Sequence, residues 1–327
     1  MGHGKLKKFA ENLTFSCLLQ PAASDVLVGG SRELVLRDHA IKGNWGKEMF
    51  GNDNPIVLEL GCGGGEYTIA LAERNPSVNY IGVDIKGARL WKGAKYATEH
   101  NLPNVAFLRT RIEFITAFFG PGEVSEIWLT FSDPQLSGSQ NSRLSSPMFL
   151  ERYRSFMVPG GIVHLKTDSR FLYEYTMSVV RANNLSLIAY GTNVYGEGIH
   201  FCEPSLRGPS RFQVGSAPLL SPCGSRPISP PSSDTASAGR SDERFYPRAA
   251  TGFQDTLHLK DISAVFEVQT FYEKMFLEMG LPITYMAFVI DHEGPFAYPE
   301  DFDADFWRAA EGPRRSFSHQ PNPHTTK

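Results

Sequence analysis

The chain has 327 residues, of which 41% are hydrophobic and 20% are charged, as in ordinary soluble proteins. No apolar run approaches the roughly 20 residues that a transmembrane helix needs, and the first residues lack the apolar core of a signal peptide. The formal net charge of −3 does not exclude a nucleic-acid partner, because the acids concentrate after residue 290 and the rest of the chain is neutral. The cysteines are scattered, which predicts a reducing, cytoplasmic location and no structural zinc (Cys17, Cys62, Cys202, Cys223).

Strand-like and helix-like segments alternate between about residues 55 and 191. Repeated β-α units of this length predict an α/β fold: a Rossmann-like, doubly wound, mostly parallel seven-stranded sheet with helices on both faces. The strands are expected at 55–61, 78–84, 104–110, 126–131, 161–168, 185–191 and 283–290, and the helices at 65–76, 88–102, 146–157, 170–184 and 262–280.

The composition divides the chain into four parts. We expect an N-terminal extension over 1–50 and one α/β domain formed by 51–198 and 262–291. Residues 199–261 are rich in Pro and Ser and have no periodicity, so they cannot bury enough apolar surface to offset their ordering entropy. They are predicted to be a disordered insertion, and the acidic and then polar tail, 292–327, is predicted to be loosely held.

A glycine turn follows the first strand of the alternating region. Gly61, Gly63 and Gly65 lie between a strand and a helix, where missing side chains let a ligand approach the backbone and the helix N-terminus. The dinucleotide pattern G-x-G-x-x-G would need glycine at position 66, which is Glu66, and the Gly-Lys-Ser/Thr of a P-loop is absent. The turn therefore favours a ligand without phosphates.

Acidic residues occur in or directly after four of the predicted strands. Glu59 lies inside an apolar strand, where a carboxylate costs desolvation energy unless a cation or hydrogen-bond donors satisfy it. Asp84 ends the second strand, where an acid can accept hydrogen bonds from two ribose hydroxyls. Asp133 and Asp168 follow the fourth and fifth strands, at the same edge of the sheet. Each alone could be a helix cap or a turn former, but four acids at four strand ends are hard to explain that way. Glu59, the glycine turn and Asp84 together resemble the S-adenosylmethionine site of class I methyltransferases.

Five stretches extend this resemblance along the chain. They are "VLELGCGGGEYTIALA", "YIGVDIKGARLWKGAKYA", "FSDPQ", "RLSSPMFLERYRSFMVPGGIVHLKTDS" and "QTFYEKMFLEMGLPITYMAF", and they are similar to the bacterial tRNA (guanine-N7-)-methyltransferase family. The resemblance implies a class I methyltransferase domain over 51–198 and 262–291, S-adenosylmethionine as cofactor and tRNA as partner. It further implies methyl transfer to N7 of the variable-loop guanine at position 46, by a monomer or homodimer without metal or membrane association.

The resemblance also implies roles for individual residues on the cofactor side. Asp133 matches the family's active-site acid, and Glu59, Asp84 and the three turn glycines match positions near the cofactor. Arg111 stands where the family has an acid that contacts adenine, and Glu113 follows two residues later. We therefore expect the adenine contact to come from Arg111 or Glu113.

On the substrate side, Asp168 matches a tRNA-contacting aspartate, and Ser137 stands where a substrate-contacting lysine is expected. The family's guanine-binding T-x-x-E segment corresponds to Thr270, Phe271, Tyr272 and Glu273.

The chemistry of the reaction defines what Asp133 can do. Guanine N7 carries a free lone pair and no proton, so its methylation needs orientation more than it needs a base. A fixed positive charge moves to the purine, and a nearby carboxylate can stabilise it. We expect Asp133 to orient the guanine and to stabilise the positive charge on it. A role for Asp133 as a general base is the less favoured interpretation.

The loop after Asp133 is poor in the cations that RNA phosphates need. "LSGSQNSRL" keeps only Arg143, so two alternatives stay open: a class I methyltransferase with a different acceptor, and a weakly catalytic RNA-binding relative. Cations elsewhere are candidates for compensation (Lys5, Lys7, Lys8, Arg152, Arg154, Lys166, Arg170 and the arginines of the insertion).

Overall fold

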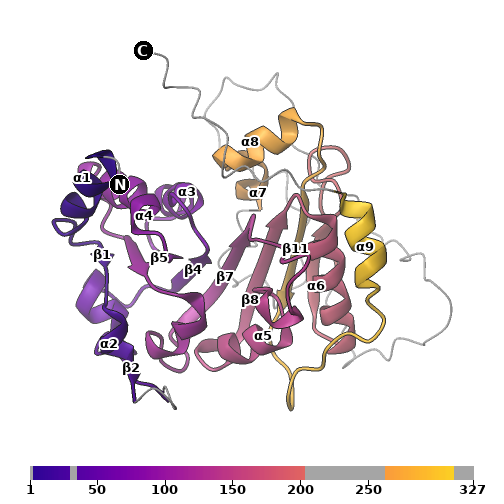
Figure 1. The fold of residues 1–327 in the computed structure, drawn as a ribbon, viewed down its shortest axis with the longest axis horizontal. Coiled ribbons are helices and arrows are strands. Elements are labelled where there is room, and N and C mark those ends of the chain that lie inside the picture. Colours follow the sequence, from indigo (N-terminus) through magenta and orange to yellow (C-terminus); the bar gives the residue numbers. More distant parts are fainter. Residues whose placement is uncertain (1–2, 30–34, 203–261, 313–327) are drawn as a thin grey trace.

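The computed structural model describes residues 3–29, 35–202 and 262–312 (Figure 1). The seven predicted strands form the centre of one sheet in the order β6-β5-β4-β7-β8-β11-β9, which confirms the predicted fold class. All neighbours in this part pair in parallel except β11, which runs antiparallel to β8 and β9. The strands are β4 (Ile56–Leu60), β5 (Asn79–Asp84), β6 (Val105–Arg109), β7 (Val124–Thr130), β8 (Met157–Thr167), β9 (Leu187–Gly191) and β11 (Thr284–Val289).

Two short strands lengthen the sheet to nine within the described residues. β1 (Leu18–Leu19) pairs with β6 at one edge, and β10 (His200–Phe201) pairs with β9 at the other. Two residues are too few for an alternating pattern, which is why the sequence predicts seven strands only. A separate hairpin joins β2 (Leu27–Val28) and β3 (Val35–Leu36), next to the short helix α2 (Ala23–Val26).

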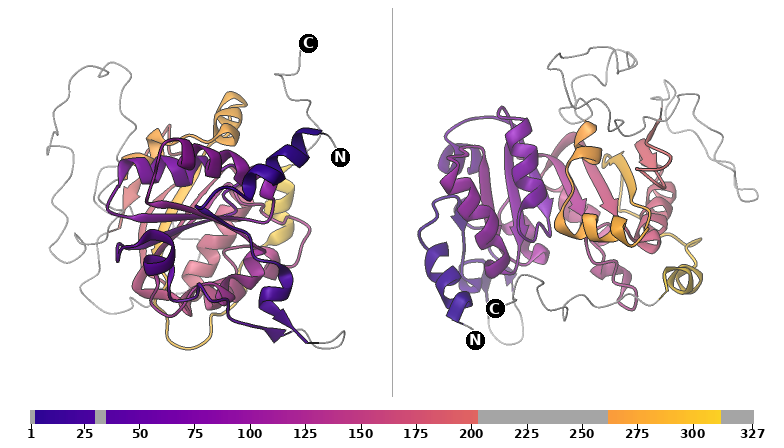
Figure 2. Two further views of the ribbon diagram at one scale, coloured as in Figure 1. Left: turned by 90° about the vertical axis from the view of Figure 1, so that its left-hand side faces the viewer. Right: turned by 90° about the horizontal axis from the view of Figure 1, so that it is seen from above.

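Helices cover both faces of the sheet (Figure 2). The strand side chains alternate between two separate apolar cores: on β4, Leu58 and Leu60 enter one core and Val57 enters the other. The Leu58 core is covered by the π-helical turn η1 (Trp45–Phe50), the 3₁₀ turn η2 (Ile112–Ala117), α5 (Pro147–Arg154) and α6 (Arg170–Ala182), and the Val57 core by α3 (Glu66–Arg74), α4 (Gly87–Glu99) and α7 (Ser263–Glu267).

Described segments before residue 51 pack onto the domain. α1 (His3–Asn12) lies against α4, where the Asn12 amide donates to the Gly87 carbonyl at 2.8 Å. Trp45 is fully buried, and its indole N–H donates to the Phe118 carbonyl at 2.8 Å. The segment predicted as an N-terminal extension therefore supplies part of the core.

The predicted helix 262–280 is two helices. α7 ends before Val268, and α8 (Phe271–Glu278) begins after Thr270, whose hydroxyl accepts from the Glu273 backbone N–H at 3.2 Å. The helix breaks because Thr270 takes the N-cap position, which requires an extended backbone. In Figure 1, α7 and α8 lie at the end of the sheet to which β7 and β8 point.

The described part of the C-terminal tail is held against α6, contrary to the prediction of a loosely held segment. Phe302 makes edge contacts with the rings of Phe171 and Tyr175, with centroids 5.2 and 5.3 Å away. α9 (Ala304–Glu311) follows, and a Glu311 carboxylate oxygen accepts from the Phe171 N–H at 3.0 Å. Aromatic residues in an acidic segment provide this anchoring. Of the predicted insertion, residues 203–261 lie outside the described residues.

Candidate functional site

The glycine turn joins β4 to α3 at the carboxyl edge of the sheet. Gly61, Gly63 and Gly65 all have positive φ, of 82°, 57° and 73°. A Cβ added at Gly61 or Gly63 would meet nothing within 4 Å, whereas one at Gly65 would lie 2.5 Å from the Phe107 ring. Gly65 is therefore needed to pack α3 on the sheet, and Gly61 and Gly63 leave open space beside the backbone.

Asp84 holds the glycine turn from the next strand. Its carboxylate accepts from the Gly63 N–H at 3.0 Å and from the Lys86 N–H at 2.7 Å. The side chain is buried and aimed at the turn, as an acid that receives ribose hydroxyls must be. Ile85 follows it with 52% of its surface exposed. The sequence prediction does not include Ile85, although an apolar residue directly after a strand-ending acid could have indicated it.

Glu59 is buried on the α3 face of the sheet, and its hydrogen bonds are made within the protein. One carboxylate oxygen accepts from the backbone N–H and hydroxyl of Thr68, and the other accepts from the Thr130 hydroxyl. Burial raises the pKa of Glu59 from its ordinary value of 4.5 to about 7, although these bonds oppose the shift. Thr68 and Thr130 are site residues that the sequence prediction does not include.

Asp133 stands in a strained turn directly after β7. Its side chain is exposed, and one oxygen accepts from the Gln135 N–H at 2.9 Å. The two residues that flank the turn, Phe131 and Gln135, have φ of 50° and 51°, a conformation that costs non-glycine residues about 1–2 kcal/mol each. Strain of this kind is retained where the surrounding structure imposes it, often at functional sites.

Arg143 stabilises that turn through hydrogen bonds to its backbone. It is 2% exposed and donates to the carbonyls of Pro134 and Gln135 at 3.2 and 3.3 Å. Its guanidinium also lies 4.8 and 4.5 Å from the ring centroids of Phe171 and Tyr175. The only cation of the predicted RNA-binding loop is therefore structural, and Ser137 is exposed on that loop.

Glu273, the last residue of the T-x-x-E segment, is a fully buried residue in the first turn of α8. Its carboxylate lies 2.7 Å from the Lys166 ammonium and accepts from the Tyr195 hydroxyl at 2.8 Å. Burial raises the pKa of Glu273 and lowers that of Lys166, and the pairing opposes both shifts. Lys166 is thus a core residue, and the suggestion that it binds RNA is wrong. Phe271 and Tyr272 point outward, 61% and 42% exposed.

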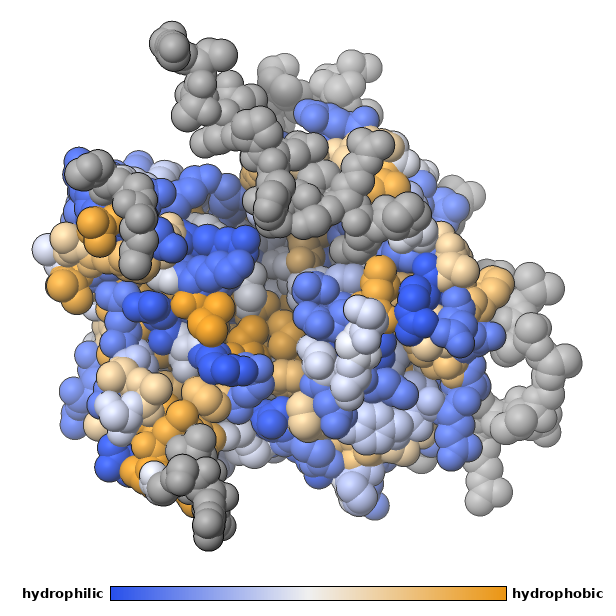
Figure 3. Space-filling model, in the orientation of Figure 1, coloured by the Kyte–Doolittle hydropathy of each residue, from blue (hydrophilic) through white to orange (hydrophobic). Residues whose placement is uncertain are grey.

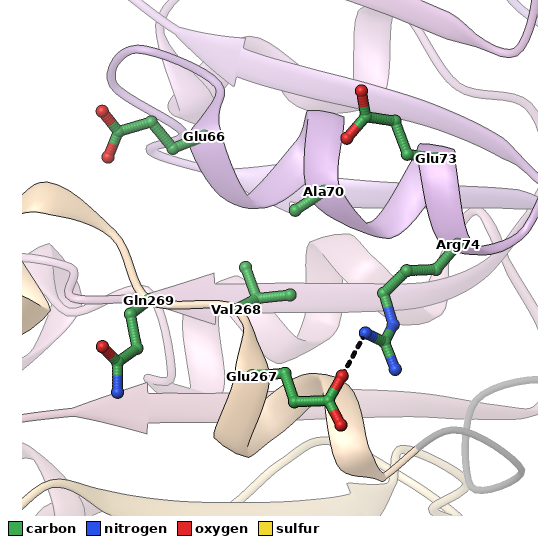
Figure 4. Close-up of a pocket in the computed structure, with 7 residues that line it drawn as sticks. All are labelled: Glu66, Ala70, Glu73, Arg74, Glu267, Val268 and Gln269. Carbon is green, nitrogen blue, oxygen red and sulfur yellow. Dashed lines mark hydrogen bonds and ion pairs between the residues drawn. The ribbon is translucent and has the colours of Figure 1, made fainter. Parts of the chain in front are cut away.

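Glu66 connects the glycine turn to the T-x-x-E segment. It is the first residue of α3, and its carboxylate accepts from the Phe271 N–H at the start of α8 at 2.7 Å. The other oxygen pairs with Lys92 of α4. Below this contact, a groove of about 400 Å³ runs between α3 and the α7–α8 connection (Figure 4). In the groove, Arg74 of α3 pairs with Glu267 of α7 at 2.5 Å.

The remaining predicted residues lie at the same edge. Asp168 is partly exposed where β8 ends, just before Ser169 caps α6. Arg111 and Glu113 follow β6 and pair with each other at 3.2 Å. Burial alone would raise the pKa of Glu113, but its own backbone N–H and Arg111 together lower it.

The cradle therefore fits a ligand such as S-adenosylmethionine. The space above Gly61 and Gly63 is open, and the Asp84 carboxylate is bonded to the Gly63 N–H beside it. Within residues 3–29, 35–202 and 262–312, no group of His, Cys, Asp or Glu has the arrangement of a metal site. Over the same residues, no helix is both long and apolar enough to cross a membrane.

Comparison with known proteins places the chain among methyltransferases. A family model described as "Putative methyltransferase" matches residues 53–201. A tRNA (guanine-N(7)-)-methyltransferase of Bacteroides fragilis is 37% identical over 97% of this chain and 98% of its own length. One of Christiangramia forsetii is 37% identical over 88% of this chain and 97% of its own length. The match to a solved 30S ribosomal A1408 methyltransferase from an uncultured bacterium covers 80% of this chain and 98% of that one, at 12% identity and a TM-score of 0.40.

A doubly wound sheet with a glycine turn after β4 and acids at its carboxyl edge defines a Rossmann-like class I methyltransferase. The relatives aligned over nearly their whole length identify the family: the chain belongs to the tRNA (guanine-N(7)-)-methyltransferases.

Proposed function

We propose that this protein transfers a methyl group from S-adenosylmethionine to N7 of a tRNA guanine, at position 46 of the variable loop. The activity follows from the relatives that match almost the full chain. The single structural observation that carries the site is Asp133, an exposed carboxylate fixed in a strained turn at the sheet edge that holds the glycine cradle. Because its substrate is tRNA, we place the protein in the cytoplasm; monomer or homodimer stays a prediction.

The cofactor half of the site is built from five residues. When bound, S-adenosylmethionine supplies an electrophilic methyl group on a sulfonium. Gly61 and Gly63 allow the methionine portion to approach the backbone, and Asp84 accepts from the ribose hydroxyls. Ile85 offers an apolar surface for one face of the adenine. Glu59 lies behind the turn, and it contributes negative charge when a cation stands near enough to ionise it.

The substrate half orients a flat base. Phe271 and Tyr272 are exposed aromatic side chains on which guanine can stack. Asp168 can accept from the N1–H and the exocyclic amine, which separates guanine from adenine. Asp133 then faces the imidazole part of the base and stabilises the positive charge that N7 methylation creates. No proton has to be removed, so Asp133 acts by orientation and charge.

Glu273 has an indirect role in this proposal. Because its carboxylate binds Lys166 and Tyr195 in the core, it holds the start of α8 and so fixes Phe271 and Tyr272. The Glu273 carboxylate is thereby used to position α8 instead of to recognise the base.

One observation favours the second candidate, a weakly catalytic RNA-binding relative: the loop after Asp133 presents no exposed cation, since Arg143 is buried. Incubation with labelled S-adenosylmethionine and an unmodified tRNA transcript, followed by mass spectrometry of the nucleosides, separates the two. We expect N7-methylguanosine from the wild type and at least a hundredfold slower formation with Asp133→Asn, which keeps the side-chain shape. Cofactor binding without any turnover would favour the weakly catalytic relative, and label on another base would favour another acceptor.

A further inference from the structure

We propose that α1 and α4 form a docking face for the phosphate backbone of tRNA, an inference that rests on the function proposed above. We call it the α1–α4 basic face. It consists of four cations gathered around two aromatic rings, Phe9 and Trp91 (Lys5, Lys8, Lys95 and Arg109), together with Lys7 on α1.

The rings fix the cations in place. The Lys8 and Lys95 ammonium groups lie 4.5 and 5.6 Å from the centroid of Trp91, whose N–H donates to Glu11 at 2.6 Å. Around Phe9, the Lys5 ammonium and the Arg109 guanidinium lie 5.9 and 5.7 Å from the ring centroid. Residues from α1, α4 and β6 therefore bring their charges to one corner of the molecule.

This corner is positive in a chain whose formal net charge is −3. Two acids oppose the five cations: Glu11 lies 3.7 Å from Lys7, and Glu99 lies 3.0 Å from Lys95. Lys5, Lys8 and Arg109 form no ion pair with a described carboxylate. The face thus keeps an excess of three positive charges, which attracts a polyanion.

The face adjoins the cofactor edge. Arg109 ends β6 directly opposite Asp84 in the register of the two strands, and Asn12 of α1 is bonded to Gly87 at the start of α4. A hollow of about 390 Å³ lies beside the cations, lined by Phe9, Leu13, Gln20 and Arg109. At the α1 corner of Figure 3, upper left, hydrophobic residues lie next to hydrophilic ones. Leu13 is 82% exposed, and Phe9 and Trp91 are half-buried. Cations beside such aromatic and apolar surface suit unpaired nucleotides, which offer both phosphates and bases.

Other cations that could bind RNA are buried or form ion pairs and hydrogen bonds within the protein. Arg143 and Lys166 are buried, and Arg154 donates to two carbonyls near the tail and pairs with Glu151. Arg170 pairs with Glu174 on α6. Because the loop after Asp133 offers no exposed cation, the α1–α4 basic face is the best-supported source of phosphate contacts in the described part of the chain.

The test compares two triple variants of the full-length protein in tRNA binding titrations over a range of salt concentrations. Lys5→Ala, Lys7→Ala and Lys8→Ala together remove three charges from the face. The control, Lys42→Ala, Lys47→Ala and Arg181→Ala, removes three charges that lie outside this face, before and on η1 and in the last turn of α6. Melting temperature and S-adenosylmethionine affinity, measured for both, report whether the fold is intact.

We expect the face variant to bind tRNA about a hundredfold more weakly at 0.1 M salt, with a salt slope lowered by about 2 to 3, because each lost phosphate contact removes roughly 0.7–0.9 from the slope. The control should bind as the wild type does. An affinity within threefold of the wild type and an unchanged slope would overturn the inference while leaving the methylation activity in place. A wild type that neither binds nor methylates tRNA would instead overturn the proposed function together with the inference.

Discussion

The burial of Glu59 predicts how the free energy of unfolding changes with pH. Its carboxylate is buried, and its pKa stands at about 7 compared with an ordinary value of 4.5. An acid whose pKa is raised by folding contributes stability below pH 4.5 and loses it as the pH rises through 7, because the unfolded chain releases the proton first. Each pH unit in that window costs 1.36 kcal/mol, so the free energy of unfolding should fall by about 2.5 kcal/mol between pH 5 and pH 8.

Glu59→Gln isolates this effect. The amide oxygen can still accept from Thr68, and the amide NH₂ can donate to the Thr130 hydroxyl, so the hydrogen bonds survive without a titrating group. Urea denaturation at pH 5 and pH 8 should show that the wild type loses about 2.5 kcal/mol more than the variant. If the two proteins lose the same stability over this range, the carboxylate titrates near its ordinary value, and the account of its burial is wrong.

Three further substitutions test the contacts that hold the site. Lys166→Met should lower the free energy of unfolding by about 3–5 kcal/mol in urea titrations, because it leaves the Glu273 carboxylate buried without its cation. Adding Glu273→Leu should restore much of this stability. A double variant as unstable as the single one would contradict the pairing. Arg143→Lys should lower the single-turnover rate constant at least tenfold with cofactor affinity unchanged, because a lysine cannot bind both loop carbonyls as the guanidinium does. An unchanged rate constant would show that the turn at Asp133 holds without these bonds. Glu66→Ala should raise the KM for tRNA about tenfold, whereas Glu66→Gln, which can still accept from the α8 backbone, should leave it unchanged. Equal KM values for these two variants would mean that the contact does not position α8.

Much of the fold could be predicted because its features are local. Alternating apolar segments define the seven central strands, and the glycine turn reveals the start of α3. The break between α7 and α8 could also have been predicted, since Thr270 and Glu273 have the spacing of a capping box. In the structure, only half of that motif forms: Thr270 caps the helix, while the Glu273 side chain binds Lys166 of β8.

The partners of the buried charges could not be predicted from local patterns. Thr130 lies on β7, and it meets Glu59 only because β4 and β7 are neighbours in the sheet. Thr68 meets Glu59 because the glycine turn returns α3 over β4. Arg143 lies in a polar stretch with no periodicity, so nothing in the sequence marks it as buried. The burial of Lys166 could have been predicted, because a lysine in a strand that is covered on both faces needs a buried partner.

The central claim is methyl transfer to guanine N7 at position 46 of tRNA. The most direct measurement compares two ligated tRNA transcripts that differ at this position only, one with guanosine and one with 7-deazaguanosine, in which a C–H replaces N7. The account predicts incorporation of labelled methyl into the guanosine transcript and none into the 7-deaza transcript, with similar binding of both. Equal labelling of the two transcripts would contradict it, because the methyl group would then have a different acceptor.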